Sequence, residues 1–181
     1  MANRNLLNTF KAQAGPGLVV LLAALARLLP HLPNLTPIGG LALFGGAHLS
    51  RKSAYLLPLA AMFLSDLVLG FHSTMPYVYV SFVLAILIGR KIGKNPNAAR
   101  LVAGVLGSAA VFYLVTNFGV WVSGSLYPKT LAGLGQSYVM ALPFFRNSLT
   151  GDLVYSGVFF YGYQLASVFA QKLRLVGPRS K

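Results

Sequence analysis

Apolar runs alternate with clusters of positive charge along this chain, and the alternation limits what it can fold into. The 181 residues are 56% apolar and only 9% charged, whereas a soluble domain carries about 25% charged residues. Twelve of the fifteen Lys and Arg residues fall in four clusters: Arg4 and Lys11; Arg51 and Lys52; Arg90, Lys91, Lys94 and Arg100; Lys172, Arg174, Arg179 and Lys181. The clusters occupy every second gap between apolar runs, as the positive-inside rule predicts for a chain that crosses a bilayer six times.

The spacing therefore predicts an all-α membrane protein with six transmembrane helices. The apolar runs are Gly17–Leu29, Ile38–Leu49, Ser53–Phe71, Pro76–Ile92, Leu101–Val122 and Asn147–Ala170. Residues 1–16 form a cytoplasmic N-terminal segment, residues 17–173 the membrane domain, and residues 174–181 a basic cytoplasmic tail. Both termini are expected in the cytoplasm, with the domain in a bacterial inner (plasma) membrane.

Two stretches interrupt this regular pattern. The linker from Pro30 to Pro37 holds three prolines in eight residues, and the runs on either side of it are short for a bilayer core of about 30 Å. Short, Pro-interrupted spans point to a transporter binding site, although Ala24-Leu25-Ala26 also resembles a signal-peptide cleavage site. The stretch from Gly124 to Phe145 is expected to be an external loop, with a short re-entrant or interfacial helix before the last span.

The composition excludes several classes of function. A net charge of +13 would raise nucleic acid as a partner, but these charges lie in loops and not on one stripe, so lipid headgroups are the expected partner. The chain has no cysteine and therefore no disulfide or thiolate chemistry. No phosphate-binding, nucleotide-binding or hydrolase motif is present, so the chain is not expected to be an enzyme or to hold an intrinsic cofactor.

The two acids, Asp66 and Asp152, both lie inside predicted spans, near their outer ends. Arg27 and Arg146 lie at a similar depth. A lone charge inside the membrane costs at least about 2.5–3.5 kcal/mol, so the acids are expected to pair with these arginines. The resulting cluster either locks helices together or lines a pocket that opens to the outside.

Other candidate ligand-binding residues gather at the same level. The amides are Asn34, Asn117 and Asn147, and the histidines are His31 and His72. Tyr113, Asn117 and Trp121 share one helix face, and Trp121 suits either a pocket wall or the aromatic belt at the headgroups. Together these residues suggest a mostly apolar pocket with a few polar groups, in which His72 could also be a metal ligand.

Four segments carry a family resemblance: Arg27–Pro37, Ser65–His72, Thr116–Trp121 and Ala141–Asn147. They resemble a family of small bacterial membrane proteins similar to the substrate-binding S components of energy-coupling-factor vitamin transporters, and within that group to solitary vitamin B12 (cobalamin) uptake proteins. The resemblance runs from about Leu25 to Leu165. It implies six helices, an outward-facing vitamin pocket, and release by toppling of the protein in the membrane. The positions that it carries over to the site are His31, Asn34, Asp66, His72, Asn117, Trp121, Arg146, Asn147 and Asp152. His72 could also substitute for a cysteine as axial ligand of a corrinoid cobalt.

The chain departs from the S-component pattern in two respects. The Ala-x-x-x-Ala pair that often docks the energising transporter module is missing from the first span, so solitary action becomes more plausible than docking. The cysteine that can bind cobalt in solitary cobalamin proteins is also missing. The resulting expectation is uptake of a small vitamin-like molecule, with cobalamin or another corrinoid as the first guess. The alternatives are a structural or assembly membrane protein without substrate, and a membrane enzyme that uses His72 and Asp66.

Overall fold

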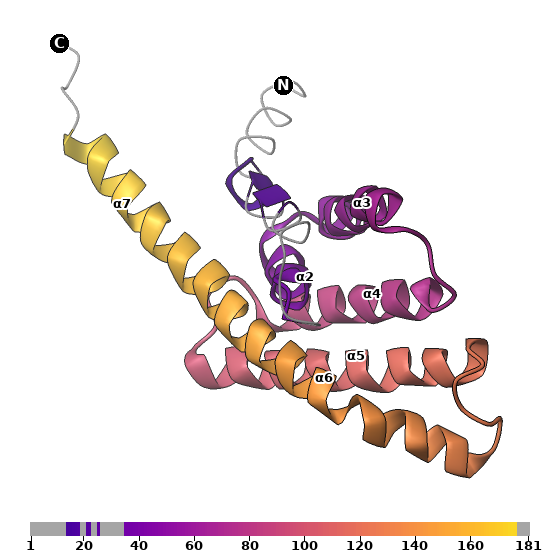
Figure 1. Ribbon diagram of the computed structural model, residues 1–181. Coiled ribbons are helices and arrows are strands. Elements are labelled where there is room, and N and C mark those ends of the chain that lie inside the picture. Colours follow the sequence, from indigo (N-terminus) through magenta and orange to yellow (C-terminus); the bar gives the residue numbers. More distant parts are fainter. Residues whose placement is uncertain (1–13, 19–20, 23–24, 26–34, 177–181) are drawn as a thin grey trace.

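The computed structural model describes residues 14–18, 21–22, 25 and 35–176, and the region from residue 35 onward is helical apart from short connections (Figure 1). Its helices are α2 (Ile38–His48), α3 (Arg51–Leu69), α4 (Met75–Ile92), α5 (Ala98–Ser123), α6 (Leu131–Gly157), the π-helical turn η1 (Val158–Gly162) and α7 (Tyr163–Val176). No β-strand occurs in this described part of the chain. The expected all-α class is therefore confirmed.

Four of the helical stretches are long and apolar enough to cross a membrane. They are Arg51–Leu69, Met75–Ile92, Ala98–Ser123 and Leu131–Lys172. α2 has only 11 residues, which reach about 16 Å. Most of the first predicted run, Gly17–Leu29, lies outside the described residues. The structure thus supports a membrane protein with four spans, and the predicted count of six stays a prediction.

The expected break before the last span is wrong. α6 begins at Leu131 and continues through Pro143, so the stretch from Leu131 to Lys172 is one helical segment of 42 residues. Pro143 removes one backbone hydrogen bond, and a long helix packed against neighbours can bend at such a point without ending. Figure 1 shows this segment changing direction along its length. Asp152 therefore lies well inside a long helix and not near the start of a short one.

Local sequence signals set the helix ends. The side chains of Ser50, Asn97 and Thr130 accept hydrogen bonds from backbone N–H groups in the first turns of α3, α5 and α6, which is the usual role of these residue types. Gly70 and Gly93 end α3 and α4 with φ of 94° and 78°. Glycine adopts such positive φ values without the steric cost that other residues meet.

α2 lies at the centre of the bundle although it is the shortest helix. Ten of its 11 residues are buried, and it contacts α3, α4, α5 and α6. A Cβ atom added to Gly89 of α4 would lie 2.9 Å from the Cα atom of Leu43 in α2. The two backbones can approach this closely because glycine has no side chain, as small residues allow in membrane helices.

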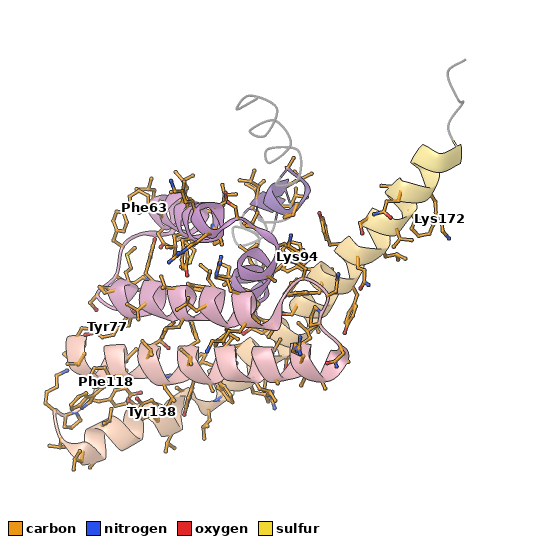
Figure 2. All side chains as sticks on the ribbon, turned by 180° about the vertical axis from the view of Figure 1, so that it is seen from behind. Phe63, Tyr77, Lys94, Phe118, Tyr138 and Lys172 are labelled. Carbon is orange, nitrogen blue, oxygen red and sulfur yellow. The ribbon has the colours of Figure 1, made fainter. Side chains whose placement is uncertain are left out.

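The bundle has two chemically different ends. The turn between α3 and α4 (residues 70–74) and the loop between α5 and α6 (residues 124–130) lie at one end, which we call the cavity end (Figure 1). Lys129 is the only Lys or Arg in those two connections. The connections at the other end lie beside Arg51, Lys52, Arg90, Lys91, Lys94 and Arg100. Figure 2 shows Lys94 far from Tyr77 and Phe118, which lie near the cavity end.

Candidate functional site

A cavity of about 480 Å³ lies between α2, α4, α5 and α6 at the cavity end. Its wall carries six aromatic side chains, namely Phe82, Phe112, Tyr113, Tyr127, Phe144 and Phe145. Its polar residues are mostly smaller: Thr36, His72, Thr74, Thr116, Asn117 and Ser148. A mostly apolar cavity of about 300–1,000 Å³ with a few polar groups is typical of a site for a small molecule.

α5 gives the cavity its depth. Its lining residues Phe112, Thr116 and Val120 recur every fourth position, so they share one helix face. Val120 lies beside the loop to α6, whereas Phe112 lies about 12 Å deeper along the helix axis. The cavity thus extends from the loop residues His72, Thr74 and Tyr127 towards the middle of the bundle.

Hydrogen bonds to backbone carbonyls hold the polar part of this wall. The Tyr113 hydroxyl donates to the Tyr138 carbonyl of α6 at 2.6 Å. The Asn117 amide donates to the Tyr113 carbonyl at 2.8 Å, and the Thr116 hydroxyl donates to the Phe112 carbonyl at 2.7 Å. These bonds satisfy the hydroxyl donors of Tyr113 and Thr116 and one of the two N–H donors of Asn117, and the Asn117 side-chain oxygen remains available as an acceptor.

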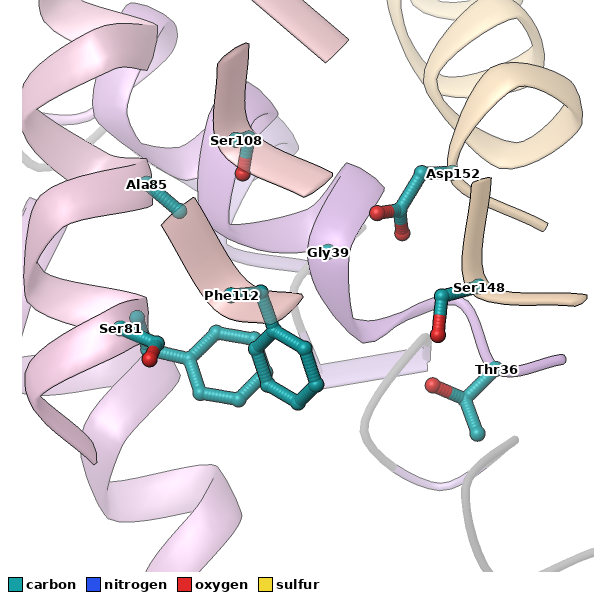
Figure 3. Close-up of a pocket in the computed structure, with 9 residues that line it drawn as sticks. Thr36, Gly39, Ser81, Ala85, Ser108, Phe112, Ser148 and Asp152 are labelled. Atoms are coloured by element: carbon teal, nitrogen blue, oxygen red, sulfur yellow. The ribbon is translucent and has the colours of Figure 1, made fainter. Parts of the chain in front are cut away.

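A second, much smaller pocket of about 50 Å³ continues from the first (Figure 3). We call it the acidic pocket, after Asp152. Its wall consists of Thr36, Gly39, Ser81, Phe82, Ala85, Ser108, Phe112, Ser148 and Asp152. Thr36, Phe82, Phe112 and Ser148 line both spaces. Ser108 lies another four residues beyond Phe112 along α5, so the acidic pocket forms the deep end of the cavity.

Asp152 is buried in the acidic pocket, with only 8% of its surface exposed. A backbone hydrogen bond joins its carboxylate to Gly40, in the first turn of α2. A Cβ atom added to Gly39 would lie 2.5 Å from Asp152 Cγ, so glycine is required here for the carboxylate to reach the helix. The free N–H groups and the dipole at a helix N-terminus stabilise a carboxylate in this position.

Hydroxyl groups make up the rest of the polar wall in the acidic pocket. The Ser81 hydroxyl donates to the Tyr77 carbonyl at 2.7 Å. Within the part of the chain that the structure describes, the hydroxyls of Thr36, Ser108 and Ser148 have no hydrogen-bond partner. In Figure 3 the hydroxyls of Thr36 and Ser148 face each other across the pocket below Asp152. They are free to bind a ligand or water.

Three of the predicted site residues line these spaces. His72 and Asn117 line the large cavity, and Asp152 lines the acidic pocket. His72 lies on the exposed turn before α4, where its Nδ1 atom is 2.7 Å from the Thr74 hydroxyl. Its predicted role as a cobalt ligand stays a prediction.

Four other predicted site residues lie outside the lining. Asp66 is 2% exposed and accepts a hydrogen bond at 2.8 Å from the Tyr79 hydroxyl. Trp121 donates to the Pro128 carbonyl at 2.9 Å, and Lys129 lies over its ring and bonds to its carbonyl. Asn147 is half-buried on α6, and Arg146 is exposed. Neither residue belongs to either wall.

Among the described residues, Arg146 forms no ion pair with Asp66 or Asp152. Tyr79 is one partner of Asp66, and Gly40 is a partner of Asp152. The long α6 carries Asp152 deep into the bundle, whereas Asp66 lies near the end of α3. The predicted pairing of an acid with Arg27 stays a prediction. Arg27, His31 and Asn34 lie outside the described residues.

Sequence reasoning missed much of the wall. Ser81 and Ser108 were not among the predicted site residues. Both interrupt apolar runs, and a hydroxyl in the middle of a span is a usable signal for a residue that lines a cavity. The rings of Phe82, Phe112 and Phe144 were also missed. Phenylalanines occur throughout the spans of this chain, and only the packing decides which of them face a cavity.

These features define a helical protein that has four helices long and apolar enough to cross a membrane and a cavity that ends at a buried acid. Its residues 10–174 match the model of a family described as "Family of unknown function (DUF6580)". The chain belongs to this family. No curated protein and no solved structure matches the chain.

Proposed function

We propose that this protein binds a small molecule in the 480 Å³ cavity and takes it up across the membrane. The observation that carries the proposal is the cavity itself, which has an aromatic wall and lies between the short helix α2 and three helices, α4, α5 and α6, that belong to stretches long enough to span a bilayer. A purely structural membrane protein has no need of such a space, since helix interiors are otherwise closely packed.

The charge distribution supports uptake from outside. The basic connections lie at the end away from the cavity, and basic loops favour the cytoplasm. The cavity would then face the outside of a bacterial inner membrane. With the first run and α2 counted as further spans, the chain would cross six times and keep both termini in the cytoplasm.

The size of the cavity favours a compact substrate. Its volume lies in the lower half of the range of about 300–1,000 Å³ that suits drug-sized ligands. A corrinoid is larger than such ligands, so cobalamin would require the cavity to widen. Uptake of cobalamin, and solitary action without an energising module, stay predictions drawn from the resemblance to S components.

Mass spectrometry of molecules that co-purify with the protein tests the proposal. The protein would be purified in lipid nanodiscs, and small molecules extracted from native protein and two variants. Phe144→Ala removes a ring from the cavity wall, and Phe63→Ala removes a ring from α3 outside the cavity. The two rings are matched in exposure, at 47% and 49%.

We expect a bound compound to be depleted at least about fivefold in Phe144→Ala, because a ring contact contributes about 1 kcal/mol or more, and to be retained in Phe63→Ala. The absorbance of the same extract reports a corrinoid directly. If native protein carries no compound that empty nanodiscs lack, or if both variants retain it equally, the cavity is not the binding site.

A further inference from the structure

The polar groups of the cavity differ between its two ends. At the end near the loops the side-chain nitrogens of His72 and Asn117 contribute to the wall. At the deep end every polar side-chain atom that the described residues contribute to the acidic pocket is an oxygen: one carboxylate and the hydroxyls of Thr36, Ser81, Ser108 and Ser148. A wall of oxygen acceptors around a carboxylate suits a ligand group that carries several N–H donors.

The residues that the structure describes compensate only part of the negative charge of Asp152. Among the described residues, no lysine or arginine lines either space. The backbone hydrogen bond from Gly40 and the N-terminus of α2 supply about half of a positive charge. A carboxylate offers about four acceptor positions, so positions remain for donors from a ligand.

Size and neighbouring rings point to a compact cationic group. The acidic pocket has about 50 Å³, and a space of about 10–15 Å³ on this measure already holds a water molecule, so a compact group such as an ammonium fits. Phe82 and Phe112 lie where the two spaces meet, with ring centroids 5.6 Å apart. Aromatic rings attract a cation near their faces and pack against an apolar ligand body.

We infer that the substrate is a compact aromatic or apolar molecule with a primary amine, whose ammonium group is seated against Asp152 while its body fills the aromatic cavity. The inference rests on the proposed function, because it assigns a chemical class to the ligand of the same cavity. It also assigns a role to Asp152, namely that of a charged anchor at the deep end.

Three probes that share a naphthalene body test this assignment. They are 2-(1-naphthyl)ethylamine, the neutral 2-(1-naphthyl)ethanol and the anionic 1-naphthylacetate. Their affinities would be measured by equilibrium dialysis against protein in phosphatidylcholine nanodiscs, with empty nanodiscs subtracted. The proteins are native, Asp152→Asn, and Asp66→Asn as a matched control at the chain's other acid, which is also buried but lies outside the cavity wall.

We expect native protein to bind the amine at least about tenfold more tightly than the alcohol, since hydrogen bonds to charged groups are the strong ones. Asp152→Asn should abolish this preference, and Asp66→Asn should keep it. The comparison of amine with alcohol on native protein needs no variant and holds even if Asp152→Asn does not fold.

Several outcomes overturn the assignment. Equal binding of amine and alcohol to native protein, or a preference for the amine that survives in Asp152→Asn, removes the charged anchor but leaves the proposed function intact. Binding of all three probes that requires sodium assigns the acidic pocket to a sodium ion instead. If no probe binds above empty nanodiscs, the ligand class is wrong, and the extraction experiment then decides separately whether the cavity binds anything.

Discussion

Gly89 lies where α4 crosses α2, and a methyl group at this position should force the two helices apart. An added Cβ atom would lie 2.9 Å from both the Cα atom and the carbonyl carbon of Leu43, and closer still to its carbonyl oxygen. Ordinary contacts between carbon and oxygen have lengths of about 3.3–3.6 Å. The crowded atoms belong to the backbone, so no rotation of a side chain can relieve the contact.

The expected magnitude follows from two opposing effects. Overpacking in a well-packed interior costs about 1–3 kcal/mol, whereas alanine in place of glycine favours a helix by about 0.5–1 kcal/mol. Gly89→Ala should therefore lower the free energy of unfolding by about 1–2 kcal/mol. Gly107→Ala on the neighbouring helix α5 is the matched control, because an added Cβ there has no atom within 4 Å, and it should raise that free energy slightly.

Unfolding in mixed micelles, titrated with dodecyl sulfate and followed by far-UV circular dichroism, measures both changes. The prediction concerns the order of stability of the three proteins: Gly107→Ala should be at least as stable as native protein, and Gly89→Ala should be clearly less stable. If Gly89→Ala is as stable as native protein, the close crossing of α2 and α4 described here is incorrect.

Two further predictions concern the acidic pocket and the orientation. Gly39→Ala should destabilise the protein by displacing the carboxylate of Asp152. The double variant with Asp152→Ala should lose less stability than the sum of the two single changes, with a coupling energy of about 1–3 kcal/mol in unfolding titrations. Additive losses of stability would mean that Gly39 and Asp152 do not interact. Because the chain has no cysteine, the single variants Lys129→Cys and Lys94→Cys report the orientation of the protein in the membrane. A membrane-impermeant maleimide added to intact cells should label Lys129→Cys and not Lys94→Cys. The opposite labelling would place the cavity end in the cytoplasm.

The fold class could be predicted from the sequence because it depends on composition and period. A chain with so few charges and such long apolar runs can satisfy its backbone in a bilayer only as helices. The runs around Asp66 and Asn117 were placed correctly for the same reason. The last span was placed inside the observed helix, but its expected start was wrong, since Pro143 was expected to separate two elements. Whether a proline ends a helix or bends it depends on the helices packed around it.

The pattern of apolar runs and basic clusters by itself determined that this chain forms apolar helices, four of them long enough to span a membrane, and it singled out Asp152 and Asn117 as polar groups that need partners. Only the tertiary structure decided which partners they have. It brings the first turn of α2 to Asp152, separates Asp66 from that site, and turns Phe82, Phe112 and Ser108 towards one space. These contacts join residues far apart in sequence. No local pattern determines which faces of α2, α4, α5 and α6 meet, because the choice of faces depends on how closely glycines such as Gly89 allow the helices to approach.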